Sequence, residues 1–226
     1  MSDKSKIWYL SSNKILKGIS KEDMMFVEKN SVMKVIDKYR FVYFPEDDAR
    51  SIYFLKKGKV KIGSYSPDGK EIIKAILKTQ EVFGEHKLMG ENTRTDFAQA
   101  IDGPVILCQM DADQFEDLLN RNATLALKVT KLVGFRLRRI ERRFEALIFK
   151  DARTRIIDFI RDMAEESGQR IGYETLIKNY LTHNDIARLT ATSRQTVTMV
   201  LNDLKQKEVI HFDRKKILIR DKAKLI

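Results

Sequence analysis

The strongest constraint on the fold lies in residues 182–204, THNDIARLTATSRQTVTMVLNDL, which have the pattern of two short helices joined by a tight turn. Thr182 stands where the first helix would begin, and Asp185 follows three residues later, as in a capping box. The Thr-Ala-Thr segment at 190–192 is too short and too polar to continue that helix. Ser193 is then placed to cap a second helix. Two capped helices this close together predict a helical hairpin.

The second helix of this hairpin has one apolar and one polar face. Its apolar side chains recur at helical spacing and are Val197, Val200, Leu201 and Leu204. In a helix-turn-helix, the second helix enters the major groove of DNA, where Arg194 could bond guanine twice and Gln195 could do the same for adenine. The predicted DNA contacts are Thr182, Ser193, Arg194, Gln195, Thr198, Met199, Asn202 and Lys215. The alternative is an ordinary helical hairpin whose polar face meets only solvent.

The charge balance favours a polyanionic partner. The chain has 226 residues, with 43 Lys and Arg against 32 Asp and Glu, and a formal net charge of +11. These basic residues are not gathered in a tail, and the apolar fraction is sufficient for a core, which excludes global disorder. A chain of this length is expected to form two domains joined by a long element. Together, the charge and the hairpin predict that the partner is double-stranded DNA.

The single cysteine, Cys108, excludes an internal disulfide and a four-cysteine iron–sulfur or zinc site within one chain, and its Val-Ile-Leu neighbours predict a buried strand. No apolar run is long enough to span a membrane, and the start of the chain lacks a secretory signal, so a cytoplasmic protein without membrane contact is expected. The histidines His86, His183 and His211 lie far apart, and no nucleophile motif is present. These observations argue against an enzyme and against a metal site.

The N-terminal half predicts helices followed by an antiparallel sheet. Residues 7–38 have apolar side chains at helical spacing, broken at Gly18. From residue 39, short β-rich runs alternate with turns. In the Ser-Pro-Asp-Gly turn at 66–69, the glycine accepts the positive φ that a hairpin needs. Several short strands at this spacing predict an antiparallel barrel or jelly roll, and with the helical C-terminal part the expected fold class is α+β.

Residues 82–100 interrupt the strand pattern and contain groups that can bind an anion. Gly84 lets backbone N–H groups approach a phosphate, and Arg94 has a planar charged fork. Thr95 adds a hydroxyl donor, and Glu85 can accept a hydrogen bond from a ribose hydroxyl. The alternative is a surface loop that contains a single arginine, and spacing alone favours that loop.

A long helix is expected from residue 111 to about residue 149, with a capped start at Asp111-Ala112-Asp113. Apolar residues recur along it at spacings of three and four, which is close to the seam of a coiled coil. These residues are Val129, Val133, Leu137, Ile140, Phe144 and Leu147. Arginines flank this narrow stripe, and a narrow stripe fits one facing helix, so we expect a parallel two-helix dimer seam. The alternative is a helix buried against its own domain.

A hinge is expected at residues 149–151, where Asp151 would cap a further helix. Residues 170–181 have the pattern of a strand. Residues 205–221 alternate into a final hairpin around the turn 213–215, which would form the wing of a winged helix-turn-helix. Lysines at that turn could bond phosphates, adding affinity without sequence preference and making binding fall steeply with salt.

The order of these elements resembles the CRP/FNR family of bacterial transcription regulators, relatives of the cyclic-AMP receptor protein. The resemblance covers roughly residues 16–219 and is most specific in the LTHNDIA and TSRQTV segments of the helical hairpin. It implies a cyclic-nucleotide-binding type of β-roll with N-terminal helices at 1–110, a long dimerisation helix at 111–149 and a winged helix-turn-helix at 150–226. It also implies an effector-responsive homodimer that reads a palindromic operator and works with RNA polymerase.

By the same resemblance, a cyclic nucleotide or another small effector would be bound by Gly84, Glu85, Arg94, Thr95, Ile140 and Glu141. Several residues depart from the pattern of the cyclic-AMP binders. Asp96 replaces a small residue, and its carboxylate would repel a phosphate unless it turned away. Ile140 cannot hydrogen-bond a purine amino group, so cyclic AMP is disfavoured, and another effector or activity without one remains open.

Two cofactors of related regulators are also disfavoured. Relatives that sense oxygen hold an iron–sulfur cluster on N-terminal cysteines, which this chain lacks. A haem-sensing relative uses a histidine in the region of His86, but a lone loop histidine is typical of a solvent-facing side chain. A remaining alternative for the whole chain is a cyclic-nucleotide-binding regulatory module whose C-terminal helical domain binds protein. The basic wing and the TSRQTV helix start argue against that alternative.

Overall fold

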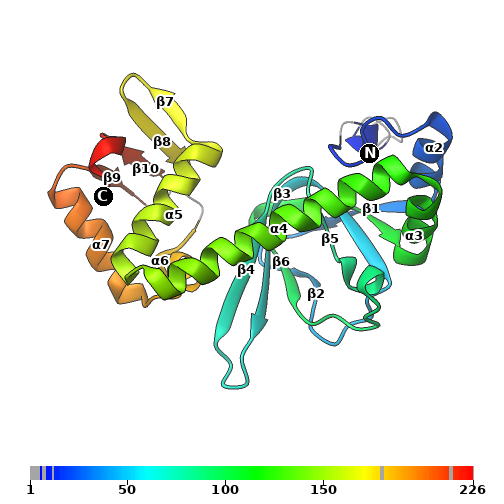
Figure 1. The fold of residues 1–226 in the computed structure, drawn as a ribbon, viewed down its shortest axis with the longest axis horizontal. Coiled ribbons are helices and arrows are strands. Elements are labelled where there is room, and N and C mark those ends of the chain that lie inside the picture. Colours follow the sequence, from blue (N-terminus) through cyan, green and yellow to red (C-terminus); the bar gives the residue numbers. More distant parts are fainter. Residues whose placement is uncertain (1–5, 7–8, 12, 179–180, 214–215, 226) are drawn as a thin grey trace. The chain divides into compact units, whose positions relative to one another are not determined.

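The computed structural model describes residues 6, 9–11, 13–178, 181–213 and 216–225. The chain divides into two compact units, Met1–Arg136 and Leu137–Ile226. Figure 1 follows the chain through both units, and the long helix α4, Ala123–Phe149, contributes residues to each of them.

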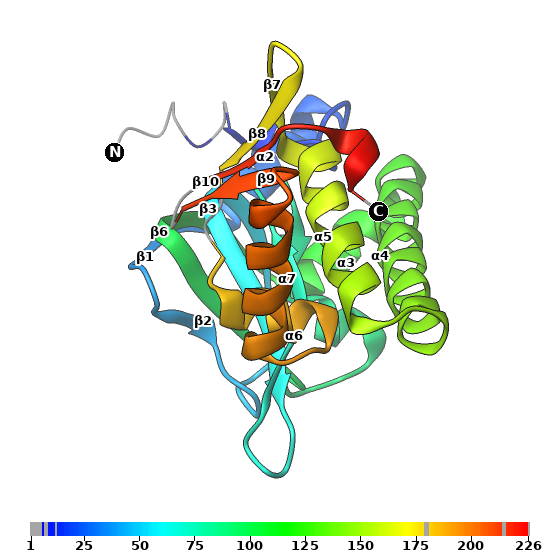
Figure 2. The ribbon, with the colours of Figure 1, turned by 90° about the vertical axis from the view of Figure 1, so that its left-hand side faces the viewer.

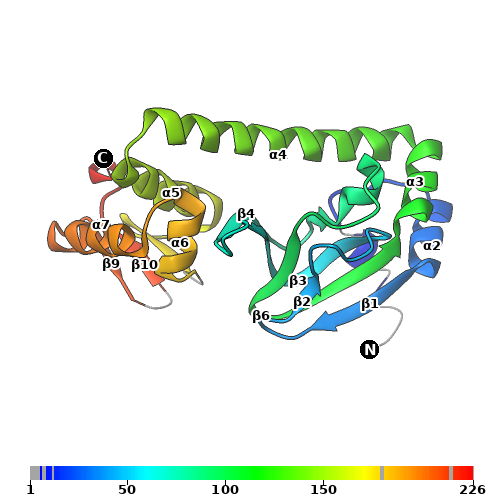
Figure 3. The same ribbon diagram turned by 90° about the horizontal axis from the view of Figure 1, so that it is seen from below.

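The first unit is built on an antiparallel sheet. Its elements before α4 are α2 Lys21–Lys29, β1 Ser31–Ile36, β2 Phe41–Tyr43, β3 Ser51–Tyr65, β4 Glu71–Leu77, β5 Val82–Phe83, the 3-10 helix η1 Glu85–Met89, β6 Phe97–Asp111 and α3 Ala112–Arg121. The sheet has the order β1-β6-β3-β4, with β2 also paired to β6 and β5 paired to β3 (Figure 3). The register of the long strands β3 and β6 shifts twice around Lys57, and such bulges bend a sheet. The predicted antiparallel β-roll and α+β class are confirmed.

Alternation along β3 divides the apolar side chains of this unit between two cores. Phe54 packs edge-on against Phe115 of α3, with 5.7 Å between ring centroids, in the core that the helices cover. Its neighbours Tyr53 and Leu55 point to the other face and enter the second core inside the roll. Cys108 of β6 is fully buried in the first core, as predicted, and lies between Met33 of β1 and Phe54 of β3 in the strand register.

The prediction of helix throughout residues 7–38 is wrong for its last part. Residues 31–36 form strand β1, which pairs antiparallel with β6 from Ser31 opposite Met110 to Ile36 opposite Val105. Val32 and Val35 are exposed on this strand, so their spacing does not mark a buried helix face. Pairing with β6 satisfies the backbone of the segment, and such a long-range partner outweighs local periodicity.

The helix expected over residues 111–149 is divided into α3 and α4. Asp111 caps α3, as predicted, and its carboxylate accepts hydrogen bonds from the backbone N–H groups of Asp113 and Gln114. The chain leaves helical geometry at Asn122, whose side-chain oxygen accepts a 2.9 Å bond from the Leu125 N–H. The 27 residues of α4 then end at Phe149, where the sequence predicts the end.

The second unit contains a helix-turn-helix and a small sheet. Its elements after α4 are α5 Ala152–Ser167, β7 Gln169–Ile171, β8 Glu174–Lys178, α6 His183–Thr190, α7 Arg194–Gln206, β9 Ile210–Phe212, β10 Lys216–Ile219 and the 3-10 helix η2 Lys222–Lys224. The sheet has the order β7-β8-β10-β9. Figure 2 shows α5, α6 and α7 beside this sheet. The three helices pack against one another, and their buried side chains include Ile156, Ile160, Ile186, Val197 and Leu201.

The single strand expected at residues 170–181 is instead a hairpin of β7 and β8. The chain reverses at Gly172, whose φ of 61° is in the left-handed region that glycine enters without steric cost. The prediction of one continuous strand is therefore wrong, and a glycine between two β-rich runs is a hairpin signal. By contrast, Gly69 does close the predicted turn, with a φ of 77° and a 2.8 Å bond from its N–H to the Ser66 carbonyl.

Candidate nucleic-acid interface and effector cassette

The helix-turn-helix of the second unit begins with the predicted capping box. The Asp185 N–H donates to the Thr182 hydroxyl at 3.1 Å, and the Thr182 N–H donates to the Asp185 carboxylate at 2.9 Å. Helix α6 ends at Thr190, and its C-cap Ala191 has a φ of 49° although it is not glycine. Ser193 then caps α7 by accepting a 3.0 Å bond from the Thr196 N–H. Local side-chain to backbone bonds therefore set both helix starts.

Helix α7 buries the apolar face predicted for it and presents the polar face to solvent. Val197, Val200, Leu201 and Leu204 are all buried. On the other side, the exposed residues are Ser193, Arg194, Gln195, Met199 and Asn202. Thr182 of the α6 cap is also exposed. This arrangement is the one that a major-groove reading helix requires, and base contacts by these residues remain a prediction.

Thr198 is a candidate DNA contact on α7 whose hydroxyl links the two helices of the helix-turn-helix. It donates to the Arg194 carbonyl at 2.9 Å and lies 2.9 Å from the Nδ1 atom of His183. Burial lowers the pKa of His183, and the charge of Arg194 lowers it further, so the ring favours its neutral form. Spacing along the sequence does not predict this contact, because it joins residues from two different helices.

The predicted wing is present as the hairpin of β9 and β10. Asp213 and Lys216 close it, with the Asp213 N–H donating to the Lys216 carbonyl and the Lys216 N–H donating to the Asp213 carboxylate, both at 2.9 Å. Lys216 is exposed. The predicted phosphate contact Lys215 lies outside the described residues.

The residues predicted to bind an effector begin at a tight turn of the first unit. Gly84 has a φ of 84° and precedes η1. A Cβ atom at this position would lie 2.8 Å from the Tyr53 ring and 2.9 Å from the Ser51 carbonyl oxygen, so the close packing also requires glycine. We call the residues Gly84, Glu85, His86, Arg94 and Asp96 the effector cassette.

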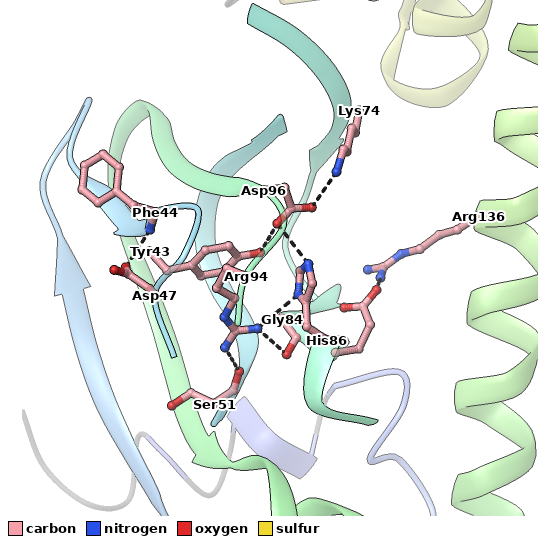
Figure 4. Close-up of polar contacts among 11 residues, drawn as sticks. Tyr43, Phe44, Asp47, Ser51, Lys74, Gly84, His86, Arg94, Asp96 and Arg136 are labelled. Carbon is pink, nitrogen blue, oxygen red and sulfur yellow. Dashed lines mark hydrogen bonds and ion pairs between the residues drawn. The ribbon is translucent and has the colours of Figure 1, made fainter. Parts of the chain in front are cut away.

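Arg94 is at the centre of the effector cassette and has no exposed surface. One terminal nitrogen donates to the Gly84 carbonyl at 2.7 Å, and the other donates to the Ser51 carbonyl at 2.5 Å (Figure 4). The guanidinium carbon lies 4.5 Å from the centre of the Tyr43 ring, a cation–π distance. Two carbonyl groups and the Tyr43 ring thus already contact the arginine that was predicted to hold a phosphate.

His86 links Arg94 to Asp96. Its Nδ1 atom lies 3.3 Å from an Arg94 terminal nitrogen, and its Nε2 atom lies 3.4 Å from the Asp96 carboxylate (Figure 4). Arginine can only donate, so Nδ1 must accept, and the ring proton then sits on Nε2 and points to Asp96. With 6% of its surface exposed, His86 does not face solvent, so that prediction is wrong: ring contact with Tyr43 and these two polar partners hold it inside.

Asp96 is buried and receives two further partners. The Tyr43 hydroxyl donates to its carboxylate at 3.2 Å, and the Lys74 ammonium lies 3.4 Å away. Burial raises the pKa of the Tyr43 hydroxyl far above its usual range, and the negative charge of Asp96 raises it further, so the tyrosine remains a donor. The carboxylate that would repel a phosphate therefore already has a hydrogen-bond donor and a cation as partners within the protein.

Glu85 of the effector cassette is paired with Arg136 of α4. The Arg136 guanidinium donates to the Glu85 carboxylate and to the Val82 carbonyl, in the part of α4 that belongs to the first unit. Thr95 is exposed. Ile140 and Glu141, the other predicted effector residues, are exposed and belong to the second unit, so their role stays a prediction. No sequence signal pointed to Arg136, since its partner is 51 positions away along the chain.

The predicted dimer seam on α4 is an exposed apolar stripe for most of its length. Val129 packs partly against the core of the first unit. Val133, Leu137 and Leu147 are exposed, and Ile140 and Phe144 are 61% and 63% exposed. A helix buried against its own domain would not leave such side chains in solvent.

Comparison with known proteins identifies both halves of the chain. Residues 33–122 match the cyclic nucleotide-binding domain, and residues 154–226 match the Crp-like helix-turn-helix domain. The global nitrogen regulator of Nostoc sp. (strain PCC 7120) is 30% identical over 83% of this chain and 85% of its own length. This chain belongs to the CRP/FNR family. A CRP-like cAMP-activated global transcriptional regulator of Mycobacterium tuberculosis is also 30% identical, over 77% of each chain.

Solved structures show the same CRP/FNR fold. A mutant of CooA from Carboxydothermus hydrogenoformans superposes with a TM-score of 0.76 at 23% identity, covering 92% of this chain and 90% of that one. FixK2 from Bradyrhizobium japonicum has a TM-score of 0.75 at 20% identity, over 86% of this chain and 95% of its own. The two domain matches and the curated relatives make the chain a CRP/FNR transcription regulator with a DNA-binding helix-turn-helix; these families and relatives are regulators and not enzymes.

Two structural absences concern only the part of the chain that the structure describes. There, no helix is both long enough and apolar enough to cross a bilayer. Within the same residues, no three His, Cys, Asp or Glu side chains gather as a metal site would require. The match to the cyclic nucleotide-binding domain indicates a site for a small-molecule effector in this CRP/FNR regulator.

Proposed function

We propose that this regulator works as a homodimer and reads a palindromic operator with α7 of each copy. The observation that carries the proposal is the exposed polar face of α7, on a helix whose other face is fixed in the core. Arg194 and Gln195 lie in its first turn, where base edges are met. The exposed thioether of Met199 is suited to an apolar contact such as a thymine methyl. We assign sensing to residues 1–110, dimerisation to 111–149 and DNA binding to 150–226.

The proposed partner of the α4 stripe is α4 of a second copy. Its exposed members follow the spacing of a coiled-coil seam, and burial of side chains of this size against an identical stripe drives helix pairing. A parallel pair would carry two reading helices related by a two-fold axis. Palindromic half-sites would then be roughly 34 Å apart, one turn of the double helix.

The experiment that tests this function starts from selection of duplexes from a random pool by the purified full chain. The selected duplex and an unrelated duplex of equal length are then compared by fluorescence anisotropy, and the mass of the protein is measured by light scattering. We expect an inverted repeat, a dimer, and affinity for the repeat about a thousandfold or more above that for the unrelated duplex. A monomer that binds both duplexes equally would contradict the proposal.

We also propose that the effector is not cyclic AMP held in the manner of the cyclic-AMP binders. Three features support this: both terminal nitrogens of Arg94 donate to carbonyl oxygens, Glu85 is paired with Arg136, and Asp96 contributes a carboxylate. A phosphate would have to displace these contacts and approach a negative charge. A different small effector, or operator binding that needs none, fits the effector cassette better.

Calorimetry of the full chain with cyclic AMP, cyclic GMP and cyclic di-GMP tests this part. The relatives give a reason for the panel, since the Mycobacterium tuberculosis regulator is cAMP-activated and the Xanthomonas campestris regulator CLP is c-di-GMP responsive. We expect no saturable heat with cyclic AMP and operator binding without it. Saturable binding of cyclic AMP by the wild-type chain would contradict the proposal.

RNA polymerase remains a proposed partner. The tip of the β7–β8 hairpin offers a surface for a protein contact, because Ile171 and Tyr173 are both exposed there. Exposed apolar side chains at the tip of a hairpin are well placed to bind another protein. If this hairpin contacts the polymerase, Tyr173→Ala should lose transcription in vitro while operator binding stays unchanged.

Since a DNA-reading regulator works where the bacterial chromosome lies, we infer a cytoplasmic location.

A further inference from the structure

The turn between α6 and α7 has a backbone that needs external support. Ala191 adopts φ 49° and ψ 52°, a left-handed conformation that is disfavoured for a residue with a Cβ atom. The carbonyls of Thr190 and Ala191 come at the end of α6, where no further turn of helix supplies N–H donors. The angle between α6 and the reading helix α7 depends on this turn.

Arg155 of α5 supplies the missing donors. Its Nε atom donates to the Thr190 carbonyl at 2.9 Å, and one terminal nitrogen donates to the Ala191 carbonyl at 3.1 Å. Its other terminal nitrogen donates to the Lys150 carbonyl at 2.7 Å, directly after the end of α4. One planar guanidinium thus joins Lys150, the residue that follows α4, to the turn that precedes α7. Its donors are fixed in one plane, so the three hydrogen bonds depend on one another.

Arg153 makes a second link from α5, two residues earlier. Its guanidinium lies 2.6 Å from the carboxylate of Asp203, in the last turn of α7. Lys207 shares that carboxylate, and bonds from Lys207 and then Arg153 lower the pKa of Asp203, which keeps it charged. Figure 2 shows α5 beside α6 and α7 in the second unit, so both arginines act within one packed group of helices.

We propose that Arg155, supported by Arg153, is the positioning residue that fixes the reading helix relative to the end of α4. This inference rests on the proposed reading of an operator by α7. Arg155 touches no base in this role. It acts through the turn at Ala191, so that a movement at the end of α4 is passed to α7.

The test compares Arg155→Lys with Arg161→Lys in the full chain. Lysine cannot serve three carbonyls in one plane, so Arg155→Lys should lower affinity for the selected operator about ten- to hundredfold, the range typical of coupled sites. Affinity for an unrelated duplex, which depends on phosphate contacts, should be unchanged. Arg161 is the matched control, because it lies on the same helix and binds Asp158 and the Leu225 carbonyl instead of the turn. Its substitution should change operator affinity by no more than about twofold.

The specificity ratio separates positioning from a merely structural role. If Arg155→Lys only unfolds part of the protein, both duplexes lose binding in proportion to the unfolded fraction measured by circular dichroism, and the inference is overturned. Asp203→Asn provides an independent arm, since it weakens the Arg153 link while leaving the bonds of Arg155 intact; it should lower the ratio by a smaller factor. A specificity ratio equal to that of the wild type in both variants would overturn this inference but leave the proposed function standing. A wild-type chain without any operator preference would overturn the proposed function as well.

Discussion

Two arginines, Arg94 in the effector cassette and Arg194 at the start of α7, have the same chemistry and opposite surroundings. Arg94 is fully buried, and its terminal nitrogens donate to the Ser51 and Gly84 carbonyls. Arg194 is exposed at the first position of a capped helix. The desolvation of the first guanidinium is compensated during folding, whereas that of the second would be compensated only when another molecule binds. Burial with internal partners therefore indicates a role in stability, and exposure on a fixed helix indicates recognition.

The largest expected effect is that of Arg94→Ala on stability. The substitution leaves a cavity and deprives the buried Gly84 carbonyl and the partly buried Ser51 carbonyl of their donor, so it should lower the free energy of unfolding by about 3 kcal/mol or more. Urea denaturation followed by circular dichroism measures this. A loss below about 0.5 kcal/mol, the usual size for a surface substitution, would show that Arg94 is not a structural residue.

Arg194→Ala should give the reverse result. The free energy of unfolding should stay within about 0.5 kcal/mol of wild type. Binding to the selected operator should weaken by about 1–3 kcal/mol, with relaxed preference at one base pair of each half-site. Competition binding with single-base operator variants checks this. Equal weakening on every sequence would instead indicate a phosphate contact.

Thr198→Val probes a residue intermediate between the two arginines. Its hydroxyl has partners within the protein, His183 and the Arg194 carbonyl, yet it lies on the reading helix. Valine keeps the shape and removes the hydroxyl, so the free energy of unfolding should fall by about 1 kcal/mol. Thr198→Ser, which retains the hydroxyl, is the matched control. Equal stability of Thr198→Val and wild type, with weaker operator binding, would make the hydroxyl a DNA contact.

The smallest expected effect is a pH dependence from His183. Its folded pKa is lowered, first by burial and then by the charge of Arg194, so the unfolded chain binds the proton more readily. The contribution of neutral His183 to stability is therefore complete above the unfolded pKa of about 6.5 and is lost as the pH falls below it. Urea denaturation at several pH values should show a shallower acid decline for His183→Gln than for wild type. Identical declines would exclude His183 as the cause.

Local signals in the sequence were sufficient for the helix-turn-helix. The bonds that define its two helix starts join residues three positions apart, Thr182 with Asp185 and Ser193 with Thr196. Such contacts can be recognised from spacing, because the geometry of one helical turn is fixed. The hairpin at Gly69 was predictable for the same reason.

Contacts between distant segments were not predictable in this way. Strand β1 has helical spacing, and only its pairing with β6, more than 60 positions away, makes it a strand. The burial of His86 depends on Tyr43 and Asp96, and Glu85 is paired with Arg136 on a different element. The sequence placed Arg94 in the effector cassette but could not show that carbonyls of the same chain occupy its donors.

The position of Cys108 has a practical consequence for measuring the separation of the reading helices. The thiol is fully buried between β1 and β3, and burial raises its pKa, so little reactive thiolate is available to a maleimide dye. A cysteine engineered at the exposed Gln206, the last residue of α7 and not one of the predicted DNA contacts, could then be labelled selectively without removing the native one. Energy transfer between dyes on two copies would then report the distance between the two α7 helices, with and without operator.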